Sequence, residues 1–194
     1  KSETYGSGMH INLSLYKNDG TNALYNAEDE NGLSQEGYYF IGGLMKHMKA
    51  ITCITNPTIN SYKRFVPGYE APVYMGWSAK TRGPLIRVSM EKEDNSRLEL
   101  RSPDATANPY LALAVLLKAG VDGIKNQILP PECMDANMNA MTLEELEANS
   151  LKTAMAQCKK AFEAGPPKSA YLERPLILDL PQPNVRVTIN LVGE

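Results

Sequence analysis

The segment from residue 60 to residue 72, NSYKRFVPGYEAP, constrains the fold more than any other part of this chain. Pro67 and Pro72 fix their φ angles and the glycine between them permits a sharp bend, so the chain turns here. The charged residues, which include Arg64 and Glu70, require water or a charged partner, so the segment is not expected in the core. It is predicted to be either a solvated loop or a flap that closes over an anionic substrate with Glu70 at its tip.

Composition and charge exclude several classes of protein. The chain has 194 residues, enough for one domain or most of one, and a formal net charge of -2, which argues against nucleic-acid binding. It shows no signal-peptide pattern and no apolar run long enough to cross a bilayer, so no membrane partner is expected. Cys53, Cys133 and Cys158 are too few and too far apart for a disulfide framework or a zinc motif, which predicts a reducing, cytoplasmic location.

Hydrophobic periodicity predicts strands mixed with separate helices, which is the pattern of an α+β protein. The helix caps are the clearest signals. Ser34 begins one helix, Asn108 followed by Pro109 begins a second, and a capping box at Thr142 begins a third. The predicted helices are 34–55, 108–128 and 142–164, and the predicted strands are 10–16, 73–78, 85–90, 97–101 and 185–191.

A histidine and a glutamate form the first candidate site. Alternation places His10 on the polar face of the strand 10–16, and it places Glu99 on the polar face of the strand 97–101. An imidazole and a carboxylate can share a divalent ion, with further oxygen donors completing its coordination. The two residues form no local metal motif, so the alternative is a histidine at the surface or satisfied within the core.

Five arginines form the second candidate site. A guanidinium is always charged and binds carboxylate or phosphate through paired hydrogen bonds. Several of them converging on one cleft would indicate an anionic substrate, whereas arginines scattered over a solvated sheet face would need no ligand. Three fall in predicted strands, where the backbone would hold them rigidly. The five are Arg64, Arg82, Arg87, Arg97 and Arg101.

Four sequence blocks carry a resemblance to a known family. They are GSGMH at residues 6–10, the segment 56–72, RLELRSPD at 97–104 and ANPYL at 107–111. In this order they are similar to the catalytic domain of glutamine synthetase, especially the bacterial type I enzymes. Residues 1–150 thereby resemble the C-terminal portion of that domain, and residues 151–194 are an unassigned helix and a Pro-rich, strand-like tail. The resemblance implies an antiparallel sheet flanked by helices, without the family's N-terminal β-grasp domain.

The resemblance also implies a reaction. ATP would phosphorylate glutamate to γ-glutamyl phosphate, and ammonia would then displace the phosphate to give glutamine. His10 and Glu99 would bind Mg²⁺ or Mn²⁺ at the nucleotide phosphates, where the ion neutralises developing charge. Arg82 would stabilise the transferring phosphoryl group. Glu70 would close over the acyl phosphate, exclude water and accept a proton from ammonium.

The substrate-binding residues follow from the same resemblance. Glutamate would be bound by Gly6, Arg64 and Arg101. ATP would be bound by Arg82, Arg87 and Arg97. The intact family member would be a homo-oligomer, a dodecamer in the type I enzymes. Because each site in the family lies between two subunits and needs the N-terminal domain, this chain is expected to be inactive by itself.

Two positions near the predicted site depart from the family pattern. Tyr5 stands where the family usually has Asn or a small residue, which affects the glutamate contact at Gly6. Asn12 stands where many members have the second histidine of Met-His-x-His, so no second imidazole serves the nucleotide.

Two other functions remain open. A ligase that couples glutamate to another amine, such as a polyamine or methylamine, would use the same arginines and Glu70, since only the amine pocket differs. A non-catalytic domain that only folds and assembles would not need them.

Overall fold

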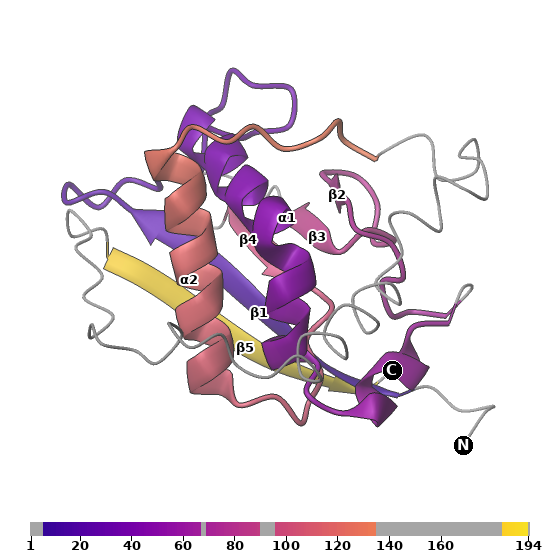
Figure 1. Cartoon of the computed structure of the whole chain (residues 1–194). Coiled ribbons are helices and arrows are strands. Elements are labelled where there is room, and N and C mark those ends of the chain that lie inside the picture. The colour runs from indigo at the N-terminus through magenta and orange to yellow at the C-terminus, as the bar shows by residue number, and fades with distance from the viewer. Residues whose placement is uncertain (1–5, 67–68, 90–95, 135–183, 194) are drawn as a thin grey trace.

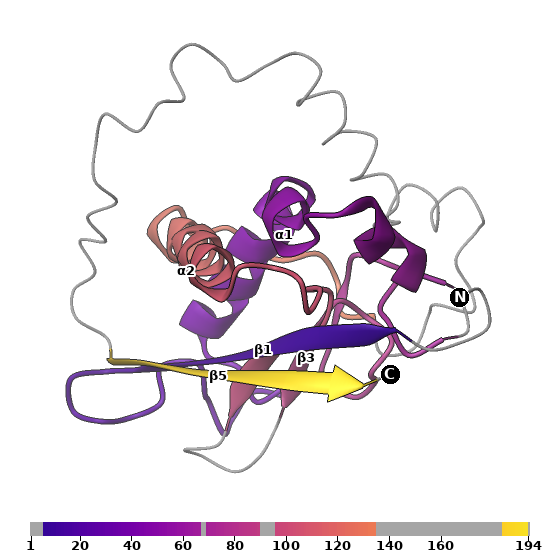
Figure 2. The same cartoon turned by 90° about the horizontal axis from the view of Figure 1, so that it is seen from below.

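The computed structural model describes residues 6–66, 69–89, 96–134 and 184–193, the last of these by its backbone. The strands are β1 Ser7–Tyr16, β2 Trp77–Ser78, β3 Ile86–Ser89, β4 Arg97–Leu100 and β5 Asn184–Gly193. The helices are α1 Gln35–Thr55, the 3₁₀ helix η1 Ile59–Arg64 and α2 Pro109–Lys125. The sheet has the order β2-β3-β4-β1-β5, antiparallel except between β2 and β3, and α1 and α2 lie on one of its faces (Figures 1 and 2). The prediction of an α+β fold with an antiparallel sheet and flanking helices is confirmed.

The two long helices begin at the predicted caps. Ser34 Oγ accepts a hydrogen bond from Gly37 N at 3.0 Å, and Asn108 Oδ1 accepts from Tyr110 N at 3.0 Å. The helices approach each other closely where glycines face one another, because a Cβ at Gly43 would collide with the backbone of Ala119 and Gly123. Small residues at this crossing therefore set the distance between α1 and α2.

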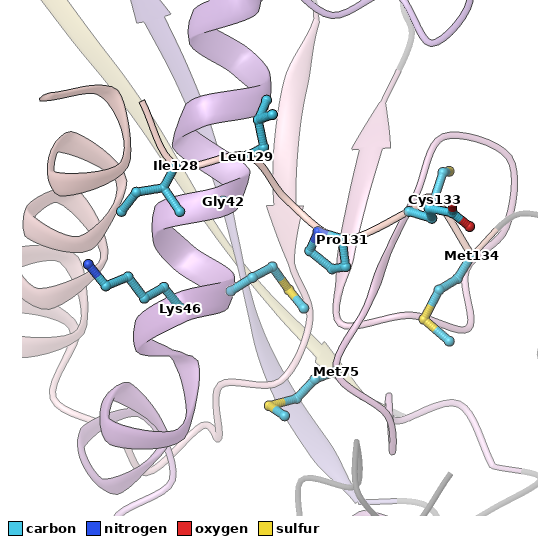
Figure 3. Close-up of a pocket in the computed structure, with 10 residues that line it drawn as sticks. Gly42, Lys46, Met75, Ile128, Leu129, Pro131, Cys133 and Met134 are labelled. Atoms are coloured by element: carbon cyan, nitrogen blue, oxygen red, sulfur yellow. The ribbon is translucent and has the colours of Figure 1, made fainter. Parts of the chain in front are cut away.

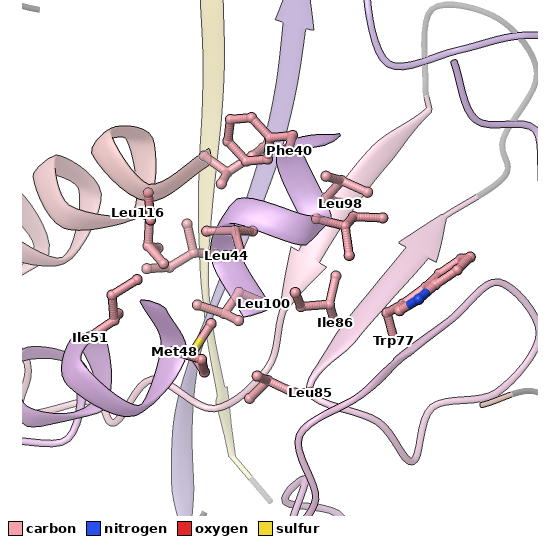
Figure 4. Close-up of a cluster of buried hydrophobic side chains, with 14 of the residues drawn as sticks. Phe40, Leu44, Met48, Ile51, Trp77, Leu85, Ile86, Leu98, Leu100 and Leu116 are labelled. Atoms are coloured by element: carbon pink, nitrogen blue, oxygen red, sulfur yellow. The ribbon is translucent and has the colours of Figure 1, made fainter. Parts of the chain in front are cut away.

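The core lies between these helices and the apolar face of the sheet (Figure 4). Phe40, Leu44 and Met48 project from α1 at helical spacing and are at most 1% exposed. They pack in one cluster with Leu98 and Leu100, which alternate along β4. The opposite face of β4 therefore carries the polar residues between them.

The central strand β1 is buried on both faces. It pairs with β4 on one side and with β5 on the other. Ile11 and Leu13 are fully buried on the helix side, as alternation predicted. His10 and Asn12 on the other side are also buried, at 7% and 5% exposure. Buried polar side chains need partners, and His10 and Asn12 each have one within the candidate site.

The segment 60–72 differs from its prediction as a wholly exposed loop. It begins within η1, and Tyr62, Arg64 and Phe65 are buried. The rings of Tyr62 and Phe65 pack edge to face, with centroids 6.0 Å apart. The aromatic residues thus anchor this segment in the core, while Glu70 is exposed.

Several element boundaries also differ. The strand predicted at 73–78 is reduced to β2, because only residues 77 and 78 pair with β3. The second helix ends at Lys125 instead of residue 128, and the predicted strand 185–191 lies within β5. The predicted helix 142–164 and the domain boundary at residue 150 lie outside the described residues.

Two further predictions concern cysteines and membranes. Cys133 is a thiol outside any disulfide, whereas Cys53 is in a disulfide, which the cysteine spacing did not predict. No helix among the described residues is both long and apolar enough to cross a membrane.

Candidate functional site

Three neighbouring strands bring polar side chains together on the sheet face that points away from α1 and α2. In the strand register, Glu99 of β4 lies opposite Arg87 of β3 on one side and opposite Asn12 of β1 on the other. His10 precedes Asn12 by two residues and therefore lies on the same face. The backbone hydrogen bonds of the sheet hold this row of residues together, so it is rigid before any ligand arrives.

Glu99 is the centre of this row. Its Oε1 lies 3.1 Å from His10 Nδ1, and its Oε2 accepts a hydrogen bond from Arg87 Nη1 at 3.3 Å. The hydrogen bond with His10 lowers the pKa of Glu99 from 4.5 to about 2, helped by the nearby charges of Arg101 and Arg87 and opposed by burial. Glu99 is therefore an ionised carboxylate at neutral pH.

The His10–Glu99 pair fits a divalent ion. Ligands on adjacent corners of an octahedron with bonds of about 2.1 Å lie about 3 Å apart. The 3.1 Å between His10 Nδ1 and Glu99 Oε1 matches that spacing. The described residues contain no cluster of three or more His, Cys, Asp or Glu side chains suited to a metal, so within them His10 and Glu99 would supply two ligands of such an ion.

Asn12 is a residue of this face that the sequence prediction missed as a site residue. Its Oδ1 accepts a hydrogen bond from Arg97 Nε at 3.2 Å. Because the guanidinium can only donate, this contact fixes the orientation of the amide. Within the described part of the chain the buried Asn12 Nδ2 has no hydrogen-bond partner, which is a costly arrangement without a ligand. The signal was available, since alternation placed Asn12 beside His10.

Gly6 and Arg64 form a second part of the site. A Cβ at Gly6 would lie 3.0 Å from Arg64 Cγ, so the glycine makes room for the arginine stem. Arg64 Nη2 donates to the carbonyl oxygens of Ser102 at 2.6 Å and Pro103 at 3.2 Å. The sequence placed Gly6 and Arg64 in one site, and the structure brings them into contact.

Arg101 joins the two loops that carry Glu70 and Arg82. Arg101 Nη1 donates to the carbonyl oxygen of Arg82, and Nη2 donates to the carbonyl oxygen of Glu70 at 3.4 Å. Arg101 is buried, whereas the side chains of Glu70 and Arg82 are exposed. The side chain of Arg101 therefore links the backbones of these two loops.

The arginines converge only in part. Arg87 and Arg97 lie on the sheet face with Glu99, and Arg101 is close enough to lower the pKa of Glu99. Arg64 instead binds the chain just after Arg101. The side chain of Arg82 is exposed and lies on a separate loop.

A hollow among the described residues lies elsewhere. It has a volume of about 530 Å³ and is lined by α1, Met75 and the segment after α2, including Cys133 and Met134 (Figure 3). None of the predicted site residues lines it. The site is instead the polar face of the sheet around Glu99, with two adjoining loops.

The fold and this face define an α+β domain with a carboxylate–imidazole pair and several guanidiniums on one side of its sheet. Comparison with known proteins identifies the family. The profile described as glutamine synthetase, catalytic domain, matches residues 1–178. The chain belongs to the glutamine synthetase catalytic-domain family.

Curated relatives carry the name glutamine synthetase. Glutamine synthetase from Clostridium saccharobutylicum is 55% identical over 146 residues, covering 75% of this chain and 33% of that protein. Glutamine synthetase from Thermotoga maritima is 50% identical over 158 residues, which cover 81% of this chain and 36% of that protein. A solved structure described as apo GmaS without ligand matches with a TM-score of 0.61 and 37% sequence identity. The match covers 81% of this chain and 36% of the chain in that structure. The chain spans about a third of the length of the curated relatives it matches.

Proposed function

We propose that this chain supplies residues for the ATP-dependent ligation of ammonia to glutamate through γ-glutamyl phosphate. The observation that carries the proposal is Glu99, a carboxylate with a low pKa that contacts both His10 and Arg87 on a rigid sheet face. The family to which the chain belongs gives this arrangement its chemical context.

The nucleotide side of the proposed site lies on the sheet. His10 and Glu99 would hold Mg²⁺ or Mn²⁺, which when bound neutralises charge on the phosphates. Glu99 is ionised at neutral pH and so is ready to act as a ligand. Arg87 and Arg97 stand on the same face and would bind the ATP phosphates through charge-assisted hydrogen bonds. Arg82, on the adjoining loop, would stabilise the transferring phosphoryl group.

The glutamate side adjoins the end of β4. Gly6, Arg64 and Arg101 would bind the amino acid, and the Gly6–Arg64 packing supports a shared site for the first two. Glu70 is exposed, on the loop whose backbone carbonyl accepts a hydrogen bond from Arg101. It would accept a proton from ammonium and exclude water from the acyl phosphate.

Ammonia is the favoured amine because the matched relatives at 50–55% identity are named glutamine synthetase. A polyamine or methylamine remains the second candidate, and comparing the three amines as co-substrates of the full-length protein would decide. A homo-oligomer is part of the same proposal, in line with the type I resemblance. A cytoplasmic location is proposed because the reaction consumes ATP.

Mn²⁺ binding to the 194-residue chain, followed by electron paramagnetic resonance, tests the metal site. His10→Asn and Glu99→Gln should each weaken binding at least about tenfold, because even outer-shell partners of a metal cost that much. His47→Asn is the matched control, since His47 Nε2 also contacts a carboxylate, Asp122 Oδ2 at 2.8 Å, but on the helices.

Isothermal titration of Mg²⁺–ATP then separates an enzyme from an assembly domain. Binding that is lost in Glu99→Gln and kept in His47→Asn supports the proposal. Unchanged Mn²⁺ affinity in both site variants, with no heat from Mg²⁺–ATP, would contradict it and favour the non-catalytic alternative.

A further inference from the structure

The guanidinium of Arg101 occupies an unusual place for a substrate-binding arginine, because it bonds to main chain on two separate loops. Nη1 donates to the carbonyl oxygen of Arg82 and Nη2 to that of Glu70, at 3.4 Å. We propose that Arg101 is a positioning residue that ties the backbone at Glu70 to the backbone at Arg82, so that the two catalytic side chains are set relative to each other. This inference rests on the proposed function, which assigns Glu70 and Arg82 to catalysis.

Arg101 itself is firmly held. Its backbone N–H donates to the carbonyl oxygen of Leu85 at 2.9 Å, immediately after β4, whose Leu100 pairs with Ile86 of β3. Its side chain is 4% exposed. A buried side chain on a strand end has little freedom to move, so its guanidinium acts as a fixed point for both carbonyls.

The positions of the loops that carry Glu70 and Arg82 depend on Arg101. Glu70 and Arg82 have exposed side chains, so core packing does not determine where they lie. The backbone of each loop determines where its side chain can reach, and Arg101 binds both backbones. A displacement of about 1 Å at such a site can cost roughly a hundredfold in rate, so a shared anchor has a clear advantage.

The same guanidinium can serve the substrate while it holds the loops. A carboxylate is a stronger acceptor than a carbonyl, so glutamate bound at Arg101 would pull on the group that holds both loops. Substrate binding and the positions of Glu70 and Arg82 would then be coupled.

Hydrogen–deuterium exchange of the ligand-free 194-residue chain tests the tie directly. Two backbone N–H groups report on the loops: Tyr69 N–H, which donates to Val66 O at 3.2 Å, and Thr81 N–H, which donates to Ser78 Oγ at 2.7 Å. In Arg101→Gln, exchange at both reporters should rise together by about tenfold, the effect of losing a charge-assisted hydrogen bond. Arg101→Lys keeps the positive charge but lacks the planar guanidinium that binds two carbonyls at once. Its rise in exchange should be smaller than that of Arg101→Gln at one or both reporters.

Two controls separate positioning from general destabilisation. Arg82→Gln removes a neighbouring guanidinium but keeps the carbonyl that Arg101 binds, so neither reporter should change. Leu98→Ala opens a core site on the same strand and should raise exchange broadly, including in α1, without singling out the two loops. Exchange in Arg101→Gln that rises in one loop only, in neither, or equally throughout α1 would overturn the inference.

If Arg101→Gln does not fold, Arg101→Lys against Arg82→Gln gives the same comparison, and equal exchange in those two variants would overturn the inference. The experiment uses no ligand, so it is independent of the Mn²⁺ and ATP titrations. If Mn²⁺ and Mg²⁺–ATP bind as proposed but exchange at Tyr69 and Thr81 does not change in the Arg101 variants, only the positioning role of Arg101 is refuted. If neither ligand binds but exchange at the two reporters rises together, only the proposed function is refuted.

Discussion

His10 Nδ1 lies 3.1 Å from Glu99 Oε1, although 89 residues separate them in the sequence. Antiparallel pairing of β1 with β4 produces this contact, since Asn12 stands opposite Glu99 and His10 is the next residue on the same face. The contact is therefore a property of the sheet register. A one-residue slip of β1 would turn His10 towards the helices and remove the site.

Glu99→Gln should reduce stability at neutral pH and progressively less at acid pH. The folded-state pKa of Glu99, about 2, lies below its ordinary value of 4.5, so its charge stabilises the folded chain fully above pH 4.5. That contribution, at most about 3 kcal/mol at pH 7, is lost as pH falls from 4.5 towards 2. Urea unfolding of both proteins across this range measures it.

Asp19→Asn is the matched control for Glu99→Gln. Asp19 also has a lowered pKa, mainly through its hydrogen bond with Thr21, but it is fully exposed. Its substitution should change stability little at any pH. A stability loss in Glu99→Gln that is the same at pH 7 and pH 3 would show that shape, not charge, is what the glutamate contributes.

Gly43→Ala should destabilise the fold by about 1–3 kcal/mol, because the added methyl group forces α1 away from α2. The carbonyl of Ala119 and the backbone of Gly123 occupy the space that the Cβ would need. Ala50→Ser, at an exposed position of the same helix, should stay within about 0.5 kcal/mol. Thermal unfolding of both variants followed by circular dichroism makes the comparison, and equal melting temperatures would contradict the close-packing argument.

Periodicity predicted the parts of the fold in which local chemistry and pairing agree. The helix α1 begins at the cap expected from Ser34, and β1 shows the predicted alternation at Ile11 and Leu13. The strand predicted at 73–78 failed because a strand also needs a partner. Only Trp77 and Ser78 reach β3, so the rest of that segment is not strand.

The site was predictable to the extent that it lies on regular strands. His10, Glu99 and Arg87 meet because alternation fixes their face and the register fixes their neighbours. The hydrogen bonds of Arg101 could not be predicted, since they end on backbone carbonyls of two loops whose paths no periodicity determines. The burial of Phe65 was also missed, because the charged residues and prolines around it indicated an exposed segment.

Asp122→Asn should weaken the contact between α1 and α2 only slightly. Asp122 Oδ2 lies 2.8 Å from His47 Nε2 and 3.4 Å from Lys46 Nζ, and the hydrogen bond with His47 is the main cause of its lowered pKa. The lowered pKa means that the carboxylate stabilises the fold above pH 3.8 and loses this effect as pH falls further. The cluster is exposed, so salt should screen it. Melting temperatures of wild type and variant should differ slightly at low salt and coincide at 1 M NaCl; a large difference that survives high salt would contradict this account.

Asn12→Asp should lower both the stability of the fold and its affinity for the nucleotide. The new carboxylate keeps an acceptor for Arg97 Nε, 3.2 Å away in the native chain, but it stands opposite the ionised Glu99 in the strand register, so the ligand-free fold should be less stable than wild type. It replaces the buried Nδ2 donor, which lacks a partner within the described residues, by a negative charge on the face proposed to bind ATP phosphates. Affinity for Mg²⁺–ATP should therefore fall about tenfold or more, as measured by calorimetry. Asn26→Asp makes the same chemical change at an exposed position in another loop and should leave both quantities unchanged. If Asn12→Asp lost stability and kept its affinity, Asn12 would be a structural residue and the sheet face would need another ligand.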